Sequence, residues 1–170
     1  GAGDLAKIGS GNTGATNVLR TGRKGLAVAV LLLDALKGAI PVLVAFAWFG
    51  PDMAKVVALG AVLGHCYSVY IGFRGGKAVA TAAGVVFALV WPAGLAALAA
   101  FALVVGLTRY VSLGSLTAAA AAPLTAFALG HHQYVPLLAL VALLIVLRHA
   151  GNIRRLLAGR ENKLGASRRD

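Results

Sequence analysis

Three short stretches of this 170-residue chain carry the residue types that could do chemistry. The first, residues 9–20, reads GSGNTGATNVLR, and its closely spaced glycines allow several backbone amides to point at one anion. Arg20 adds a planar guanidinium that suits phosphate. We therefore predict a phosphate cradle. Its glycines are Gly9, Gly11 and Gly14, and its uncharged donors are Ser10, Asn12, Thr13, Thr16 and Asn17.

The second stretch, residues 72–81, reads GFRGGKAVAT and places Arg74 and Lys77 beside two glycines. A helix that starts near Ala78 would turn its positive end toward the anion that Lys77 approaches. The third stretch, residues 148–161, reads RHAGNIRRLLAGRE. Its His149 and Asn152 share one helical face if the helix continues through the intervening glycine, so they can act on one substrate.

Neither glycine-rich stretch fits a nucleotide-binding fold. Residues 9–14 match the GxGxxG fingerprint and Asp34 stands at the ribose-binding distance, but the fingerprint requires a preceding strand and a βαβ unit. Here a polar segment precedes it, and Asp34 lies in a hydrophobic run. The second stretch is not a Walker A loop, because Ile71 and Ala78 occupy the positions of the first glycine and of the Ser or Thr.

A few ionisable residues lie inside hydrophobic runs. Asp34 and Lys37 are spaced to form an ion pair, which we interpret as structural. His65 is either a base or ligand or a hydrogen-bonded histidine between helices, and its position leaves both open. No Asp or Glu accompanies the histidines at metal-ligand spacing, and Cys66 is alone, so no metal site is predicted.

The composition places these stretches in a membrane. Hydrophobic residues make up 59% of the chain and charged residues 12%, which is too apolar for a soluble domain. The net charge of +11 does not indicate nucleic-acid binding, because Lys and Arg collect at the ends of hydrophobic runs. We predict an all-α, polytopic membrane bundle formed by one domain, residues 1–170.

About six spans are expected, by the rule that a span needs roughly 20 apolar residues. They are placed at residues 25–49, 54–72, 78–91, 93–108, 112–129 and 134–148. Trp91 and Pro92 favour two helices over one helix at 78–108, which stays open as an alternative. With this threading, all basic residues except Lys37 and Lys55 fall on one side, the cytoplasmic side by the positive-inside rule. The abrupt, polar start suggests that one more N-terminal span is missing.

In order and spacing, these motifs resemble the bacterial acyl-phosphate:glycerol-3-phosphate acyltransferases, the PlsY family. The resemblance rests on residues 9–20, LDALKG at 33–38, GH at 64–65, FRGGKAVAT at 73–81 and HAGNIRRLLAG at 149–159. It implies a seven-helix enzyme of the bacterial inner membrane that needs no cofactor. Such an enzyme moves a fatty acyl group from acyl phosphate to the 1-hydroxyl of glycerol 3-phosphate, giving lysophosphatidic acid. One departure is Ala78, where the family usually has Gly.

The resemblance also implies roles for individual residues. The implied catalytic residues are Ser10, Arg20, Lys77, His149 and Asn152. The implied substrate- and phosphate-binding residues are Gly9, Gly11, Asn12, Thr13, Asn17, Gly75 and Gly76. The base stays open between His149, His65 and an oxygen of the donor's own phosphate. The alternative function is a small anion or phosphate-compound transporter, since basic loops and an intramembrane ion pair also suit an ion pathway.

Overall fold

The computed structural model describes residues 14–19 and 21–165, and over this part of the chain it contains helices and no strand, which confirms the all-α prediction. The helices are α1 (Ala15–Leu19), α2 (Lys24–Cys66), α3 (Val79–Leu89), α4 (Trp91–Thr108), α5 (Val111–Ala128), α6 (Val135–Arg148) and α7 (Ala150–Leu157), with short 3-10 turns at Val69–Ile71 and His132–Tyr134. They form two compact units, Gly1–Leu89 (unit 1) and Val90–Asp170 (unit 2).

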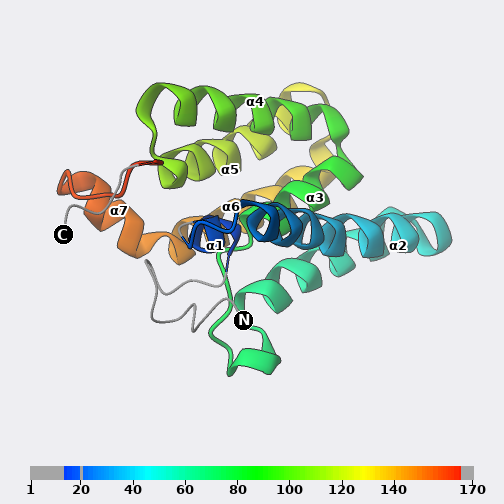
Figure 1. Cartoon of the computed structure of the whole chain (residues 1–170). Helices are drawn as coiled ribbons and strands as arrows, with labels where there is room; N and C mark the ends of the chain where they lie inside the picture. The colour runs from blue at the N-terminus through cyan, green and yellow to red at the C-terminus, as the bar shows by residue number, and fades with distance from the viewer. Residues whose placement is uncertain (1–13, 20, 166–170) are drawn as a thin grey trace. The chain divides into compact units, whose positions relative to one another are not determined.

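Helix α2 is a hairpin of two arms. Gly50 interrupts it with φ 82°, a conformation that glycine adopts without strain, and Pro51 begins the second arm, where a missing N–H costs nothing. Figure 1 shows the chain reversing direction there. The arms correspond to the predicted segments 25–49 and 54–72. The second ends earlier than predicted, at Cys66, because the following residues form the 3-10 turn and loop of the second stretch.

The region from 78 to 108 forms two helices, as the sequence favoured. Val90 separates α3 from α4 with φ −147° and ψ 77°, which are not helical values. Pro92 lies in the first turn of α4, where its ring is tolerated and its absent N–H is not needed. The alternative of one continuous helix is therefore wrong.

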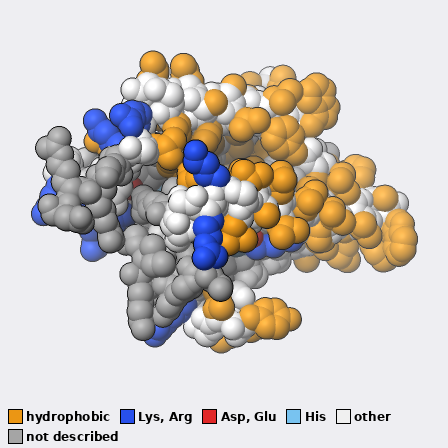
Figure 2. Space-filling model, in the orientation of Figure 1, with side chains coloured by type: hydrophobic (Ala, Val, Ile, Leu, Met, Phe, Trp, Pro, Cys, Tyr) orange, Lys and Arg blue, Asp and Glu red, His pale blue; other side chains and the backbone are white. Residues whose placement is uncertain are grey.

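The outer surfaces of several helices are hydrophobic, as a bilayer requires. Figure 2 shows hydrophobic side chains over much of α2 and α4, where Trp48 and Leu107 are each 77% exposed. Within the described residues, three helices are long and apolar enough to cross a membrane, or four if α6 and α7, bent by 63°, count as one. Helix α3 has 11 residues and falls short of that length. The number of about six membrane spans stays a prediction.

Helices α2 and α3 touch through their backbones at two glycines. A Cβ on Gly84 would lie 2.0 Å from the carbonyl oxygen of Ala35, and a Cβ on Gly38 would lie 2.2 Å from that of Thr81. Small residues allow such close approach in membranes, where packing replaces the hydrophobic effect as the force between helices. This contact fixes the position of the N-terminal turn of α3 against the first arm of α2.

Gly84→Ala should therefore lower the stability of the protein by about 1–3 kcal/mol, because the added methyl forces the two backbones apart. Gly106→Ala in α4 is the matched control, since nothing lies within 4 Å of its Cβ position and alanine favours a helix. Thermal unfolding in detergent measures both. Equal melting temperatures for the two variants would contradict the close contact.

Candidate functional site

Half of the first stretch, residues 9–13 and 20, lies outside the described residues. Ser10, Asn12, Thr13 and Arg20 are among those not described, with Gly9 and Gly11, so their predicted roles have no structural outcome. Its last part forms α1, which packs on α2. Asn17 is buried there at 2% exposed, and its backbone N–H donates to the carbonyl of Gly14 over 2.9 Å.

The loop of the second stretch is seated on the C-terminal end of α2. The N–H of Gly76 donates to the carbonyl oxygen of His65 over 3.1 Å, and a Cβ on Gly75 would lie 2.0 Å from the same oxygen. Both glycines are buried, Lys77 is half-buried and Arg74 is exposed. Gly75 and Gly76 thus seat the loop on α2 where no side chain would fit, and the loop places Lys77 just before α3.

Two residues of this loop other than glycine adopt left-handed backbone conformations. Phe73 has φ 62° and Ala78 has φ 56°. Ala78 is 1% exposed, and its carbonyl accepts the N–H of Ala82, so it begins the hydrogen bonding of α3. The expected helix start near this position is confirmed. A glycine at this position would adopt this φ without strain.

Polar side chains cluster beneath the loop. Asp34 and Lys37 form the predicted ion pair. The Nδ1 atom of His65 lies 3.1 Å from the Thr81 hydroxyl and 3.5 Å from an Asp34 oxygen. His65 therefore bridges the two arms of α2 and the start of α3. In the described part of the chain, no three His, Cys, Asp or Glu side chains are grouped in a way that would hold a metal ion.

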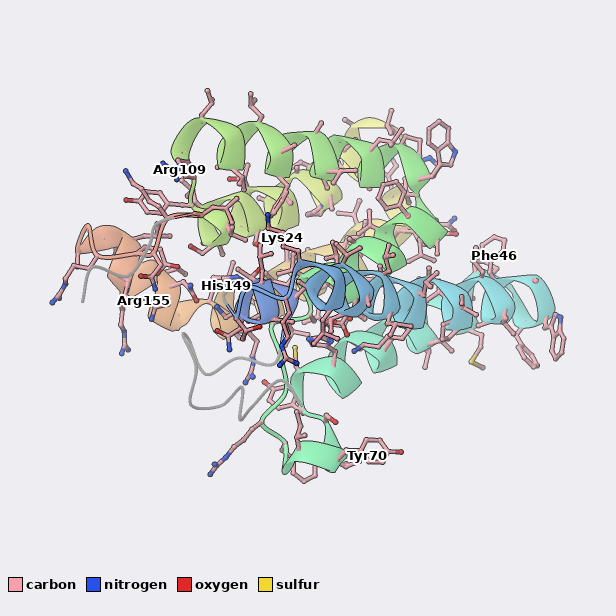
Figure 3. The ribbon with its side chains drawn as sticks, viewed as in Figure 1. Lys24, Phe46, Tyr70, Arg109, His149 and Arg155 are labelled. Carbon is pink, nitrogen blue, oxygen red and sulfur yellow. The ribbon has the colours of Figure 1, made fainter. Side chains whose placement is uncertain are left out.

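The third stretch lies at the bend between α6 and α7, in unit 2 (Figure 3). His149 sits at the bend, 2% exposed, and its Nδ1 donates to the carbonyl of Ile145 over 2.8 Å. A carbonyl oxygen only accepts, so a neutral ring carries its lone pair on Nε2. Asn152 is buried as well, at 7% exposed, in the first turn of α7.

Glu161 organises this part of unit 2, a role that the sequence alone did not reveal. Its carboxylate accepts hydrogen bonds from Ser112 over 2.9 Å, from Asn152 over 2.6 Å and from Arg155 over 2.7 Å. Burial favours a raised pKa for Glu161, but these bonds and the charge of Arg155 outweigh it and hold the pKa below its usual value. The sequence feature that could have pointed to Glu161 is that it is an acidic residue in a strongly basic segment.

The segment after Glu161 is tied to the turn between α4 and α5. The Arg109 guanidinium donates to the carbonyl of Leu164 over 2.8 Å, and the N–H of Leu164 donates to the carbonyl of Arg109 over 2.7 Å. The ammonium of Lys163 lies 5.5 Å from the ring centre of Tyr110. These contacts hold the segment that carries Glu161 in place beside α7.

A family model for glycerol-3-phosphate acyltransferases matches residues 1–159 of the chain. The chain belongs to this family. It is 53% identical over 165 residues to the glycerol-3-phosphate acyltransferase of Jannaschia sp. (strain CCS1), covering 97% of this chain and 81% of that protein. With the enzyme of Methylorubrum extorquens (strain PA1) it shares 54% identity over 166 residues, again 97% and 81% of the two chains.

Two solved structures are similar to the family member described here. Both are crystal structures of PlsY, an integral membrane glycerol 3-phosphate acyltransferase. The glycerol 3-phosphate form has a TM-score of 0.92 and 44% identity, covering 95% of this chain and 82% of that one. The lysophosphatidic acid form has a TM-score of 0.89 and 43% identity, covering 96% and 87%. This protein is therefore an integral membrane acyltransferase of the PlsY family.

Replacing Ala78 tests the strained loop. Ala78→Gly should change stability by less than about 1 kcal/mol, because relief of about 1–2 kcal/mol of strain offsets lost methyl burial and added chain entropy. Ala78→Val should cost more than about 2 kcal/mol, since a β-branched residue is strained at this φ and overfills a buried position. Thermal unfolding in detergent compares them. If Ala78→Val left the melting temperature unchanged, the left-handed conformation at this position would be contradicted.

Glu161→Gln should lower stability at neutral pH by about 1–3 kcal/mol, because an amide cannot accept all three hydrogen bonds. The wild-type advantage should be complete above the ordinary pKa of 4.5 and should disappear as the pH falls through the lowered value, since protonation then removes the same charge. Melting temperatures measured against pH test this. Asp52→Asn is the control, because that side chain is 91% exposed. A pH-independent difference would refute the role of the charge.

Proposed function

We propose that this family member transfers a fatty acyl group from acyl phosphate to the 1-hydroxyl of glycerol 3-phosphate, releasing lysophosphatidic acid and phosphate. The observation that carries the proposal is the loop of Gly75, Gly76 and Lys77. The Lys77 ammonium, held at the start of α3 by two closely packed glycines, supplies positive charge for an anion, in a family whose solved members include glycerol 3-phosphate and lysophosphatidic acid forms.

Acyl phosphate supports this choice of donor chemically. Its phosphate is a good leaving group, so the enzyme needs mainly to hold two phosphate-bearing substrates and aim one hydroxyl. The hydroxyl oxygen attacks the acyl carbon, the bond from that carbon to the phosphate oxygen breaks, and phosphate departs with the electron pair. The hydroxyl proton passes to a phosphate oxygen of the donor, so no protein base is required.

The predicted residues divide between the two units. Lys77 of unit 1 stabilises negative charge on one phosphate as it develops, and Gly75 and Gly76 shape the loop that holds it. In unit 2, His149 and Asn152 are buried and fixed by hydrogen bonds at the α6–α7 bend. Side chains whose orientation is fixed before the substrate binds are suited to orienting it. Ser10 and Arg20 complete the phosphate contacts in this proposal, and both units work as one domain.

The proposed site faces the cytoplasm of a bacterial inner membrane. The basic residues gather on one side of the predicted threading, and that side is the cytoplasmic one by the positive-inside rule. Glycerol 3-phosphate is charged and water-soluble, so it reaches the site from that aqueous side. The donor's acyl chain lies in the bilayer among the hydrophobic helices.

The decisive assay follows phosphate release from palmitoyl phosphate by the purified protein, with and without glycerol 3-phosphate. Release should depend on the acceptor and yield lysophosphatidic acid, identified by mass spectrometry. Lys77→Ala should lower the rate by about 10²–10³-fold, the usual loss when one group stabilising a transition-state charge is removed. Lys55→Ala, which removes a lysine paired with exposed Asp52, should retain activity.

Two results would overturn the proposal. Acyl transfer from palmitoyl-coenzyme A but not from palmitoyl phosphate would exclude the proposed donor. Full activity of Lys77→Ala would exclude the loop as the anion-binding element, even if the overall reaction is correct.

A further inference from the structure

The cluster of Asp34, His65 and Thr81 lies directly beneath the loop and has no part in the reaction as proposed above. We propose that His65 is a positioning residue, which holds the Gly75–Lys77 loop in its anion-binding conformation without touching substrate. This inference rests on the proposed function, because it assigns the loop to phosphate binding.

The backbone of His65 anchors the loop from below. His65 lies in the last turn of α2, where carbonyl groups have no partner within the helix. Its carbonyl instead accepts the N–H of Gly76 over 3.1 Å, and Gly75 approaches the same oxygen so closely that no Cβ fits. The carbonyl of His65 thereby fixes the backbone positions of both glycines relative to the end of α2.

The imidazole ring of His65 supports the loop from the side. A Cβ on Gly76 would lie only 2.1 Å from Nε2, so that edge of the ring rests against the glycine. The other edge is held by the hydroxyl of Thr81 at 3.1 Å and by a carboxylate oxygen of Asp34 at 3.5 Å. Thr81 is completely buried, and the His65 side chain is 8% exposed. The ring is thus wedged between two helices and the loop.

This arrangement favours positioning over proton transfer. The charged group against the ring is Asp34, which also forms the ion pair with Lys37. A base would have to present a nitrogen to the substrate hydroxyl. Here Nδ1 faces Thr81 and Asp34, and Nε2 faces Gly76, so neither nitrogen reaches a substrate without displacement of the loop.

The kinetic test separates positioning from a merely structural role. His65→Ala and His65→Asn, which both remove the ring beside Gly76, should raise the KM for glycerol 3-phosphate or for palmitoyl phosphate about ten- to a hundredfold, the cost of misplacing one hydrogen bond to a charged group. Thr81→Val should shift the same constant in the same direction by a smaller factor. Lower stability alone would reduce the active fraction and leave KM unchanged.

Thr117→Val is the matched control for Thr81→Val, because the Thr117 hydroxyl donates only within its own helix, to the carbonyl of Leu113. It should leave both KM values unchanged. His132→Ala removes an exposed histidine from unit 2 and controls for loss of an imidazole in general. Both controls are measured in the same detergent and at the same pH.

A double-mutant cycle tests the contact without any assay of activity. Gly76→Ala must displace the His65 ring, so it should lower the melting temperature in the wild-type background. In a His65→Ala background the new methyl enters space that the ring has vacated, so its cost should shrink markedly. Gly60→Ala, with nothing within 4 Å of its Cβ position, should behave identically in both backgrounds.

The outcomes separate this inference from the proposed function. If the wild-type protein shows no acceptor-dependent release, the proposed function fails, and the stability cycle still decides whether His65 holds the loop. If the wild type is active but the His65 variants keep both KM values, positioning is refuted. Strictly additive effects of Gly76→Ala and His65→Ala would refute the contact itself.

Discussion

Inside a bilayer the hydrophobic effect does not draw helices together, so α2 and α3 associate by close packing. Gly38 and Gly84 provide it, because their lack of side chains lets each helix touch a backbone carbonyl of the other. The contact brings Thr81 to His65 and sets where α3 begins. The loop that joins the helices is constrained by this contact at the start of α3 and by the seating of Gly75 and Gly76 on His65.

In unit 2, hydrogen bonds fix the orientation of polar side chains in a strongly basic segment. Glu161 does so by accepting hydrogen bonds from Ser112 in α5 and from Asn152 and Arg155 in α7. A buried carboxylate is costly unless it is paired and hydrogen-bonded, so this arrangement specifies one orientation of the Asn152 amide. Both units therefore preorganise the polar groups assigned to the substrates.

Ala78 is a residue other than glycine that is held at a positive φ in this loop. The residue retains a left-handed conformation although its methyl makes this unfavourable, and its burial partly compensates. The strain is local and is imposed by the seating of the preceding glycines on α2. Strain of this kind persists when surrounding contacts over-determine the backbone.

The sequence by itself determined the helical membrane class, the ion pair of Asp34 with Lys37 and the family, because hydropathy and short motifs are local signals. It also predicted helix breaks between residues 49 and 54 and at Trp91 and Pro92, which the structure places at Gly50 and Val90. It left the role of His65 open and gave Glu161 none. Only the tertiary structure shows which groups these two residues contact, since their partners lie 16 and 49 residues away at Thr81 and Ser112. A hydrogen bond between such distant residues depends on how helices pack, and no pattern of neighbouring residues encodes that packing.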